Sequence, residues 1–582
     1  MKKLTKISVL ISILGAFCLS SCATDDESGD SASSSSTSAS ETDEAAAAGQ
    51  ENSISSMLYL DLTNGKISCD NSLWSEITSS NLKLYSDTIS VKSTKTGLIK
   101  IDATAFTSAL SITISGTMNA GGIKIQSNGS DSVTVNLSGV TINSSNYPCL
   151  EVTKGSAAIV NLSGTNVFVD GRSYGYGYGE EEYAETSQHY VEDGSDSKGS
   201  LYSKGNLTIS GNGSLSVTQA YKNCIASKDG ILTIEKGTLN LKNYLSSSET
   251  GKNGLFGGQG IIVNGGTITF DGKGIISTSD VRKANAFKTD DDDYPESYIK
   301  INGGTISATA YNGKGLNAPC VYIAGGTNTF TVSGVTGFTG DDNRSGSWYD
   351  ADGVAESGIV KFAAEGIEGE SIVEISGGKT IVSALDDGIN VSATGGNLKI
   401  SDGFLLVKAR GDGLDSNGNI VISGGTVVVS QTGGGNSPID CGDGSYSFSV
   451  TGGTVFAMGS SDMFNECLPS STTVPYIYST SFGNSSSSLG VNGIIALLSP
   501  QTYSAALLIS SELENGKSYS FVKGGSVSGT EILSGSGLYF PASVSGGSSI
   551  SATATTQASS MGGFGGGGNP GGMNPGMPGG RR

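Results

Sequence analysis

Acidic residues recur at two fixed positions of a repeated phrase in the C-terminal half of the chain. The phrase reads Glu365-Gly-Ile-Glu368, Asp387-Gly-Ile-Asn390, Asp412-Gly-Leu-Asp415 and Ser437-Pro-Ile-Asp440. If successive copies stack in register, the first positions form one column of side chains and the fourth positions form a second. Carboxylates one strand spacing apart repel each other by roughly 1 kcal/mol even in water.

Oxygen ligands without His or Cys suit a hard cation, and Ca²⁺ accepts roughly six to eight of them in flexible geometry. The sequence therefore predicts calcium as a cofactor. The predicted ligands are Glu365, Glu368, Asp387, Asn390, Asp412, Asp415 and Asp440. The alternative is a set of solvated acidic turns that tolerate the repulsion.

A second phrase indicates why these copies would stack. Gly followed by Thr or a relative, and then by alternating apolar residues, recurs from Gly116 to Gly453 at spacings of 22 to 29 residues with a few longer steps. Such a period is typical of a solenoid. Each period holds short runs of period-two alternation and no sustained helical periodicity, so its apolar face is buried only when coils stack. The sequence predicts an all-β parallel β-helix over residues 53–475, with long loop insertions.

The period fades after residue 475. Apolar runs there predict a small antiparallel C-terminal β cap over 476–556, which would cover the exposed edge of the last coil. The Gly-, Pro- and Met-rich stretch 557–582 reads as a disordered tail.

Composition excludes several classes of function. The formal net charge is −20, so the chain lacks the basic footprint of a nucleic-acid-binding protein. There is a single histidine, His189, so neither a His-based catalytic triad nor a His-rich zinc site can be built.

The N-terminus predicts the cellular address. Lys2, Lys3 and Lys6 precede an apolar run, 7–19, that is too short to span a bilayer and therefore reads as a signal peptide. The ending Leu19-Ser-Ser-Cys22 resembles the bacterial lipoprotein lipobox, which implies removal of residues 1–21 and lipid attachment at Cys22. Residues 22–52 are a Ser-, Ala- and acid-rich tether. We expect a monomer in the bacterial cell envelope, lipid-anchored and surface-exposed; the alternative is an ordinary secretion signal.

Two insertions carry aromatic residues that could stack on sugar rings. One contains Tyr174, Tyr176 and Tyr178, and the other contains Trp348 and Tyr349. Loops on a rigid scaffold commonly hold binding residues, so these five are the predicted carbohydrate-binding residues. The alternative is that they pack their own loops onto the coils.

A catalytic alternative rests on two basic residues. A polysaccharide lyase would combine bound calcium with a base that removes a proton next to a uronate carboxylate. Lys408 and Arg410 are the candidate bases, because alternation would place them on one strand face with Asp412.

The six cysteines after Cys22 are predicted to be free. Cys149 and Cys224 would share one column with Gly260, Gly315 and Gly388, separated by a coil that passes near Ser200. Two strand spacings are about 9.6 Å, beyond the ~7 Å reach of a disulfide between Cα atoms.

Several segments together resemble a known family. They are 201–217, the stretch that begins at Asn223-Cys224, the Asp-Asp-Gly-Ile-Asn-Val segment at 386–391 and the stretch from Gly411 to Val429. They are similar to the bacterial carbohydrate-binding β-helix domain family, which has a pectate-lyase-like fold. The resemblance covers about residues 55–550 and implies a right-handed parallel β-helix, bound calcium, and binding of plant cell-wall polysaccharides such as cellulose or polygalacturonate.

The family's acidic phrases map onto Asp387, Asp412 and Asp415. Lys273 and Lys314 depart from them, because each stands where the pattern has an acid. We expect a non-catalytic, surface-tethered, calcium-stabilised binder of acidic or plant cell-wall polysaccharide. The alternatives are a calcium-dependent lyase and a structural or adhesive stalk.

Overall fold

The computed structural model describes most of the chain from residue 57 onward. The described residues are 57–69, 72–76, 82–84, 90–93, 97–106, 109–128, 132–153, 157–172, 198–247, 249–276, 281–289, 292–334, 344–349, 355–360 and 364–558. All of them belong to one compact unit, residues 54–582. The signal peptide, Cys22, the tether and the tail after residue 558 lie outside the described residues, as do Tyr174, Tyr176 and Tyr178.

The described part of the chain contains strands and no helix, so no helix there could cross a membrane. The main sheet has 38 strands, and most of its pairings are parallel and join strands from successive coils. For example, β10 pairs with β13, and β13 pairs with β16. The prediction of an all-β architecture with parallel strands is confirmed.

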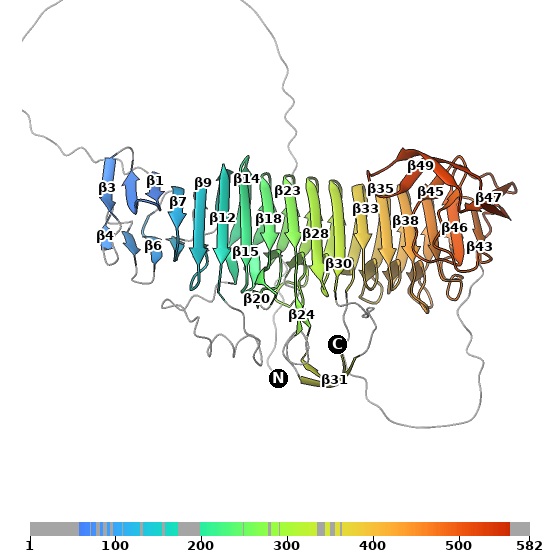
Figure 1. Ribbon diagram of the computed structural model, residues 1–582, viewed down its shortest axis with the longest axis horizontal. Helices are drawn as coiled ribbons and strands as arrows, with labels where there is room; N and C mark the ends of the chain where they lie inside the picture. Colours follow the sequence, from blue (N-terminus) through green and yellow to red (C-terminus); the bar gives the residue numbers. More distant parts are fainter. Residues whose placement is uncertain are drawn as a thin grey trace, which may run out of the picture. The chain divides into compact units, whose positions relative to one another are not determined.

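Most coils contribute one strand, or part of a longer strand, to each of three ladders, and Figure 1 shows strands of the third ladder side by side from β9 to β38. The first ladder comprises β6 (Leu98–Ala103), β8 (Gly122–Ser127), β10 (Leu150–Thr153), β13 (Gly199–Ser203), β16 (Asn223–Ser227), β21 (Leu255–Gly257), β26 (Phe287–Thr289), the starts of β29 (Leu316–Ile323) and β33 (Ile367–Ser383), β34 (Ile389–Val391), β36 (Leu414–Ser416) and β39 (Ile439–Cys441).

The second ladder comprises β1 (Met57–Asp61), the starts of β7 (Leu110–Met118) and β9 (Ser132–Ser144), β11 (Ala157–Ser163), β14 (Asn206–Gly211), β17 (Ile231–Ile234), β22 (Gly260–Val263), β27 (Tyr298–Ile301), later parts of β29 and β33, the start of β35 (Asn397–Ala409), β37 (Asn419–Ile422), β40 (Phe448–Val450) and β42 (Ser471–Thr472). The third comprises the ends of β7 and β9, β12 (Thr165–Asp170), β15 (Ser214–Gln219), β18 (Thr238–Lys242), β23 (Thr267–Asp271), β28 (Thr305–Tyr311), β30 (Thr327–Ser333), the ends of β33 and β35, β38 (Thr426–Gln431) and β41 (Thr454–Gly459).

The remaining strands before the last coil pair antiparallel. At the N-terminal side they are β2 (Lys66–Cys69), β3 (Ser72–Glu76), β4 (Leu82–Leu84) and β5 (Ser90–Ser93). Between coils they form the hairpins β19 (Tyr244–Ser246) with β20 (Glu249–Thr250), β24 (Ile275–Ile276) with β25 (Val281–Arg282), and β31 (Arg344–Tyr349) with β32 (Ala355–Val360).

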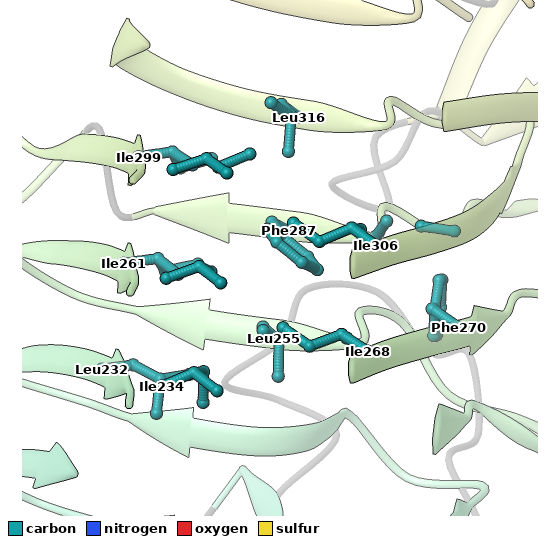
Figure 2. Packing of buried hydrophobic residues seen from close by; sticks show 14 of the residues in the cluster. Leu232, Ile234, Leu255, Ile261, Ile268, Phe270, Phe287, Ile299, Ile306 and Leu316 are labelled. Atoms are coloured by element: carbon teal, nitrogen blue, oxygen red, sulfur yellow. The ribbon is translucent and has the colours of Figure 1, made fainter. Parts of the chain in front are cut away.

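The core is built from stacked apolar side chains, one from each coil. Leu232 pairs in register with Ile261, and Ile261 with Ile299, and all three are fully buried. Figure 2 shows this stack, and beside it the stack of Leu255, Phe287 and Leu316 from the first ladder. Alternate residues along each strand therefore face the core, while the residues between them point outward.

The repeated Gly-Thr phrase marks the turn from the second ladder into the third. At Gly266, φ is +82°, and a Cβ atom would lie 2.6 Å from the carbonyl oxygen of Gly237 in the preceding coil. Only glycine fits both the backbone conformation and this close approach. The copy at Gly213 differs, because Gly211 takes the positive φ there.

The last coils are covered by residues 476–556. β46 (Ala505–Ser510) pairs antiparallel with β41 and with β43 (Tyr476–Ser479), so it covers the edge of the third ladder. A six-stranded antiparallel sheet follows, in the order β48 (Ser526–Glu531), β49 (Leu538–Ser545), β45 (Ile495–Leu497), β44 (Leu489–Val491), β47 (Ser518–Lys523) and β50 (Ser548–Thr553). Apolar residues of this segment pack on Leu406, Val428 and Phe456, which point outward from the third ladder.

Five cysteines, at 149, 224, 320, 441 and 467, are free, as predicted. The pairing of Leu150 with Leu201 and of Leu201 with Ile225 places Ser200 between Cys149 and Cys224. One detail of the predicted column is wrong. Gly254, not Gly260, follows Cys224, because the backbone N–H of Cys224 bonds to the residue before Gly254, while Gly260 belongs to the second ladder.

Candidate functional site

The predicted second column exists as a row on the outer face of the first ladder. Glu368 pairs in register with Asn390, Asn390 with Asp415, and Asp415 with Asp440. In β34, Asn390 lies between the buried Ile389 and Val391, so its side chain points away from the core. We call Glu368, Asn390, Asp415 and Asp440 the outer column.

The predicted first column lies at the turn that enters the first ladder. The backbone N–H of Gly366 donates to the carbonyl of Asp387 over 2.9 Å, and that of Gly388 donates to the carbonyl of Asp412 over 2.8 Å. The same pattern adds Lys314 before the acids and Ser437 after them. We call Lys314, Glu365, Asp387, Asp412 and Ser437 the turn column.

Two acids of the turn column accept hydrogen bonds from the next coil. Asp387 Oδ1 accepts the backbone N–H of Asp412 over 2.6 Å, and Asp412 Oδ1 accepts that of Ser437. These bonds fix the path of the turn, because buried backbone donors need an acceptor.

Asparagines form a related ladder in the middle coils, and its last member accepts a backbone N–H as the aspartates do. Asn253 Nδ2 donates to Asn223 Oδ1 over 2.9 Å, and Asn285 Nδ2 donates to Asn253 Oδ1 over 3.0 Å. Asn285 Oδ1 then accepts the backbone N–H of Lys314 over 2.7 Å. At Asn285 a neutral amide oxygen thus accepts the same kind of backbone hydrogen bond that Asp387 accepts. The charge at Asp387 and Asp412 is an addition that the turn itself does not need.

This charge is unfavourable as the side chains lie. Burial, followed by the charges of Asp386, Asp412 and Asp415, raises the pKa of Asp387 to about 9. Burial, followed by the neighbouring Asp412 and Asp440, raises the pKa of Asp415 to about 7. Burial and then Asp443 raise the pKa of Asp440.

The first acids of the two columns are in a different situation. Lys314 Nζ lies 3.7 Å from Glu365 Oε2 and contacts Glu368 Oε2. Ser392 Oγ donates to Glu368 Oε1 over 3.2 Å. Both glutamates are buried, so an ammonium group from the preceding coil supplies their counter-charge.

The donor set of the columns suits a hard cation. Apart from Lys314 and Ser437, every residue of the two columns carries a carboxylate or amide oxygen that could bind a cation. The Asn390 Oδ1 atom is buried and has no hydrogen-bond partner. Within the described ranges, no three His, Cys, Asp or Glu side chains are placed as they would be around a bound metal ion. The chemistry of the residues therefore fits calcium, which stays a prediction.

The chain also matches the model of a known protein family. The model of the family described as "Carbohydrate-binding domain-containing protein" matches residues 101–358 and 351–498, which include every coil that carries the two columns. The chain belongs to this family. Membership supports a function in carbohydrate binding.

No curated protein matches this member of the family. One solved structure that does match is titled as that of a polysaccharide lyase-like protein from C. thermocellum, in a gadolinium derivative. The two chains share 23% sequence identity, with a TM-score of 0.34. The match covers 48% of this chain and 90% of the chain in that structure.

The predicted lyase residues do not share one strand face with Asp412. β35 ends at Ala409, so Arg410 and Asp412 lie in the turn toward the first ladder, whereas Lys408 lies in the third ladder opposite Ser383 and Ser430. The prediction of a shared strand face was wrong because the alternation Lys-Ala-Arg-Gly-Asp runs past the end of the strand and through a turn. Burial lowers the pKa of Lys408, which is the direction that a general base requires.

The predicted sugar-stacking residues are only partly placed. Trp348 and Tyr349 belong to the hairpin strand β31, where they pair with Glu356 and Ala355, and their side chains lie outside the described residues. The three tyrosines of the other insertion lie outside as well.

Sequence reasoning missed the asparagine ladder and the role of Lys314. A signal was present, because Asn223-Cys-Ile, Asn253-Gly-Leu and Asn285-Ala-Phe have the same pattern as Lys314-Gly-Leu and Glu365-Gly-Ile. Allowing any small residue in the second position would have aligned all five.

Proposed function

We propose that this chain is a surface-tethered, calcium-stabilised carbohydrate-binding lipoprotein for acidic or plant cell-wall polysaccharide. It has no catalytic role in this proposal, and Cys22 carries the lipid anchor. The coils are those of a right-handed parallel β-helix, the hand that parallel crossover connections almost always take. Family membership supports the carbohydrate part of the proposal.

The observation that carries the calcium part is the use of aspartate where asparagine suffices. Asn285 accepts the equivalent backbone N–H, that of Lys314, without a charge. Burial, followed by acidic neighbours, disfavours the charge that Asp387 adds and raises its pKa to about 9. A divalent cation held by Asp387, Asp412, Asp415, Asp440 and Asn390 would make this charge favourable.

The residues of the columns would serve glycan binding because of where they lie on the sheet. The outer column projects from a rigid parallel sheet, so its oxygens keep a fixed spacing of one strand per coil. An acidic glycan would be repelled by bare carboxylates. When bound, calcium would supply the positive charge that an acidic glycan requires at this surface.

Retention on immobilised glycans tests the proposal. Purified protein is passed over immobilised polygalacturonate and over cellulose, in calcium and in a chelator. Asp387→Asn with Asp415→Asn removes charge and keeps the turn oxygen at 387, as the native Asn285 does. Asp402→Asn is the control, because it removes a carboxylate charge outside the columns from a side chain whose oxygen also accepts a backbone N–H, that of Gly403.

We expect retention on at least one of the two glycans. On polygalacturonate it should be lost in chelator and in the double variant, and kept by the control. Retention that ignores both calcium and the double variant would contradict a role for the columns. Absence of retention on both glycans would favour the stalk alternative, and release of unsaturated chain ends, followed by ultraviolet absorbance, would favour the lyase.

A further inference from the structure

The two columns begin with a lysine. Lys314 is the residue of the turn column one coil before Glu365, and its ammonium group lies against Glu365 Oε2 and Glu368 Oε2. These are the two carboxylates of the next coil, one from each column. The ammonium group thus occupies the place where a cation between the first acids of the columns would lie.

We infer that Lys314 is a built-in counter-ion that replaces a metal ion between the Lys314 coil and the Glu365 coil, so that metal binding begins only at Asp387. The inference rests on the proposed calcium function and adds to it the residue that sets where the sites start. Glu365 and Glu368 are then ligands of an ammonium group and not of calcium.

Burial explains why the position needs one cation or the other. Glu365 is 5% exposed and Glu368 is 9% exposed. A buried carboxylate without a partner is strongly destabilising, and two of them beside each other repel as well. A lysine from the preceding coil places one positive charge beside both carboxylates.

The same chain uses this arrangement a second time, where only one acid is present. Lys124 and Glu151 are register partners in the row that continues the outer column toward the N-terminus. Their Nζ and Oε1 atoms are 3.6 Å apart, and both side chains are buried. A lysine supplied by the preceding coil is therefore a recurrent way to neutralise an acid of this row.

The next coils are different. In the turn column, Lys314 lies one coil before Glu365. In the same way, Glu365 lies one coil before Asp387, and Asp387 lies one coil before Asp412. Between the Lys314 coil and the Glu365 coil, the protein supplies its own counter-ion. From the Glu365 coil onward an acid stands at the same position, so these coils require an added cation.

Counting bound calcium tests the inference. Full-length wild type, Lys314→Gln and Lys314→Gln with Glu365→Gln and Glu368→Gln are titrated calorimetrically with calcium. Lys124→Gln is the matched control, because it removes a buried lysine that pairs with a single glutamate, outside the two columns. We expect Lys314→Gln to bind one ion more than wild type, and the triple variant and Lys124→Gln to match wild type.

A second variant decides the matter if Lys314→Gln fails to fold. Glu365→Lys places an ammonium group one coil further along, before Asp387, and should bind one ion fewer than wild type. Its melting temperature in chelator should also be higher than that of wild type, because the new lysine faces acids.

An unchanged calcium count in Lys314→Gln and in Glu365→Lys would overturn the inference while leaving the proposed function intact. A wild type that binds no calcium at all would instead refute the calcium part of the proposed function. The two failures are therefore distinguishable in one experiment.

Discussion

At the scale of the residue, the choice between an amide and a carboxylate separates structure from function. A side-chain oxygen that accepts a backbone N–H of the next coil is provided by Asn285 as an amide and by Asp387 as a carboxylate. The recurrence of acids at one phase was enough to predict the columns from the sequence. The pairing of Lys314 with Glu365 and Glu368 was not predictable, because a long side chain reaches across coils in a way that spacing alone does not determine.

Metal-free protein should lose stability as the pH rises. Asp387 and Asp415 have native pKa values of about 9 and about 7, against 3.8 for the unfolded chain. The native state therefore holds protons that the unfolded state has released between about pH 4 and pH 9, and the free energy of unfolding falls across this range. Between about pH 5 and pH 8 this covers about three pH units for Asp387 and about two for Asp415, so at about 1.4 kcal/mol per unit we expect a loss of several kcal/mol.

Chemical denaturation in chelator at a series of pH values measures this slope. The double variant Asp387→Asn with Asp415→Asn should have a flatter profile, because its amides do not titrate. A wild-type stability that rises over the same range would show that these carboxyl groups are charged and satisfied without metal.

At the scale of the element, the glycine turn and the ends of strands decide what positions the columns. The turn was readable from the sequence as a Gly-Thr mark, because a positive φ and a close approach both select glycine. The end of β35 was not readable. Its alternation runs on through Arg410 to Asp412, and only the pairing of Ala409 with Gln431 shows where the third ladder stops.

Gly425→Ala should destabilise the protein more than Gly435→Ala. Both glycines have nearly the same φ, +76° and +78°, so both substitutions cost about 1–2 kcal/mol of backbone strain. At Gly425 the new Cβ would also lie 2.8 Å from the Gly403 carbonyl oxygen, whereas at Gly435 nothing lies within 4 Å. Overpacking adds roughly 1–3 kcal/mol.

Denaturant unfolding of the two variants gives the difference directly. Equal losses of stability would mean that the coils can separate at the turn, and that the glycine is required only for its backbone conformation.

At the scale of the whole molecule, the repeat period predicted the stacked parallel coils, and what it missed is how residues 476–556 pack. Leu406, Val428 and Phe456 point outward from the third ladder and are covered by that segment. A signal was present in the runs Phe404-Leu-Leu-Val, Val427-Val-Val and Val455-Phe-Ala-Met, which do not alternate. Continuous apolar runs are typical of strands that are buried on both faces.

Calcium-dependent thermal unfolding tests the central claim most directly. The melting temperature is measured in calcium and in chelator, for wild type and for Asp387→Asn with Asp415→Asn. A ligand that binds only the native state stabilises it, by about 2.7 kcal/mol at a concentration one hundred times its Kd. We predict a clear rise in melting temperature with calcium in wild type and little or none in the double variant. A wild type that melts at the same temperature in calcium and in chelator would contradict the account.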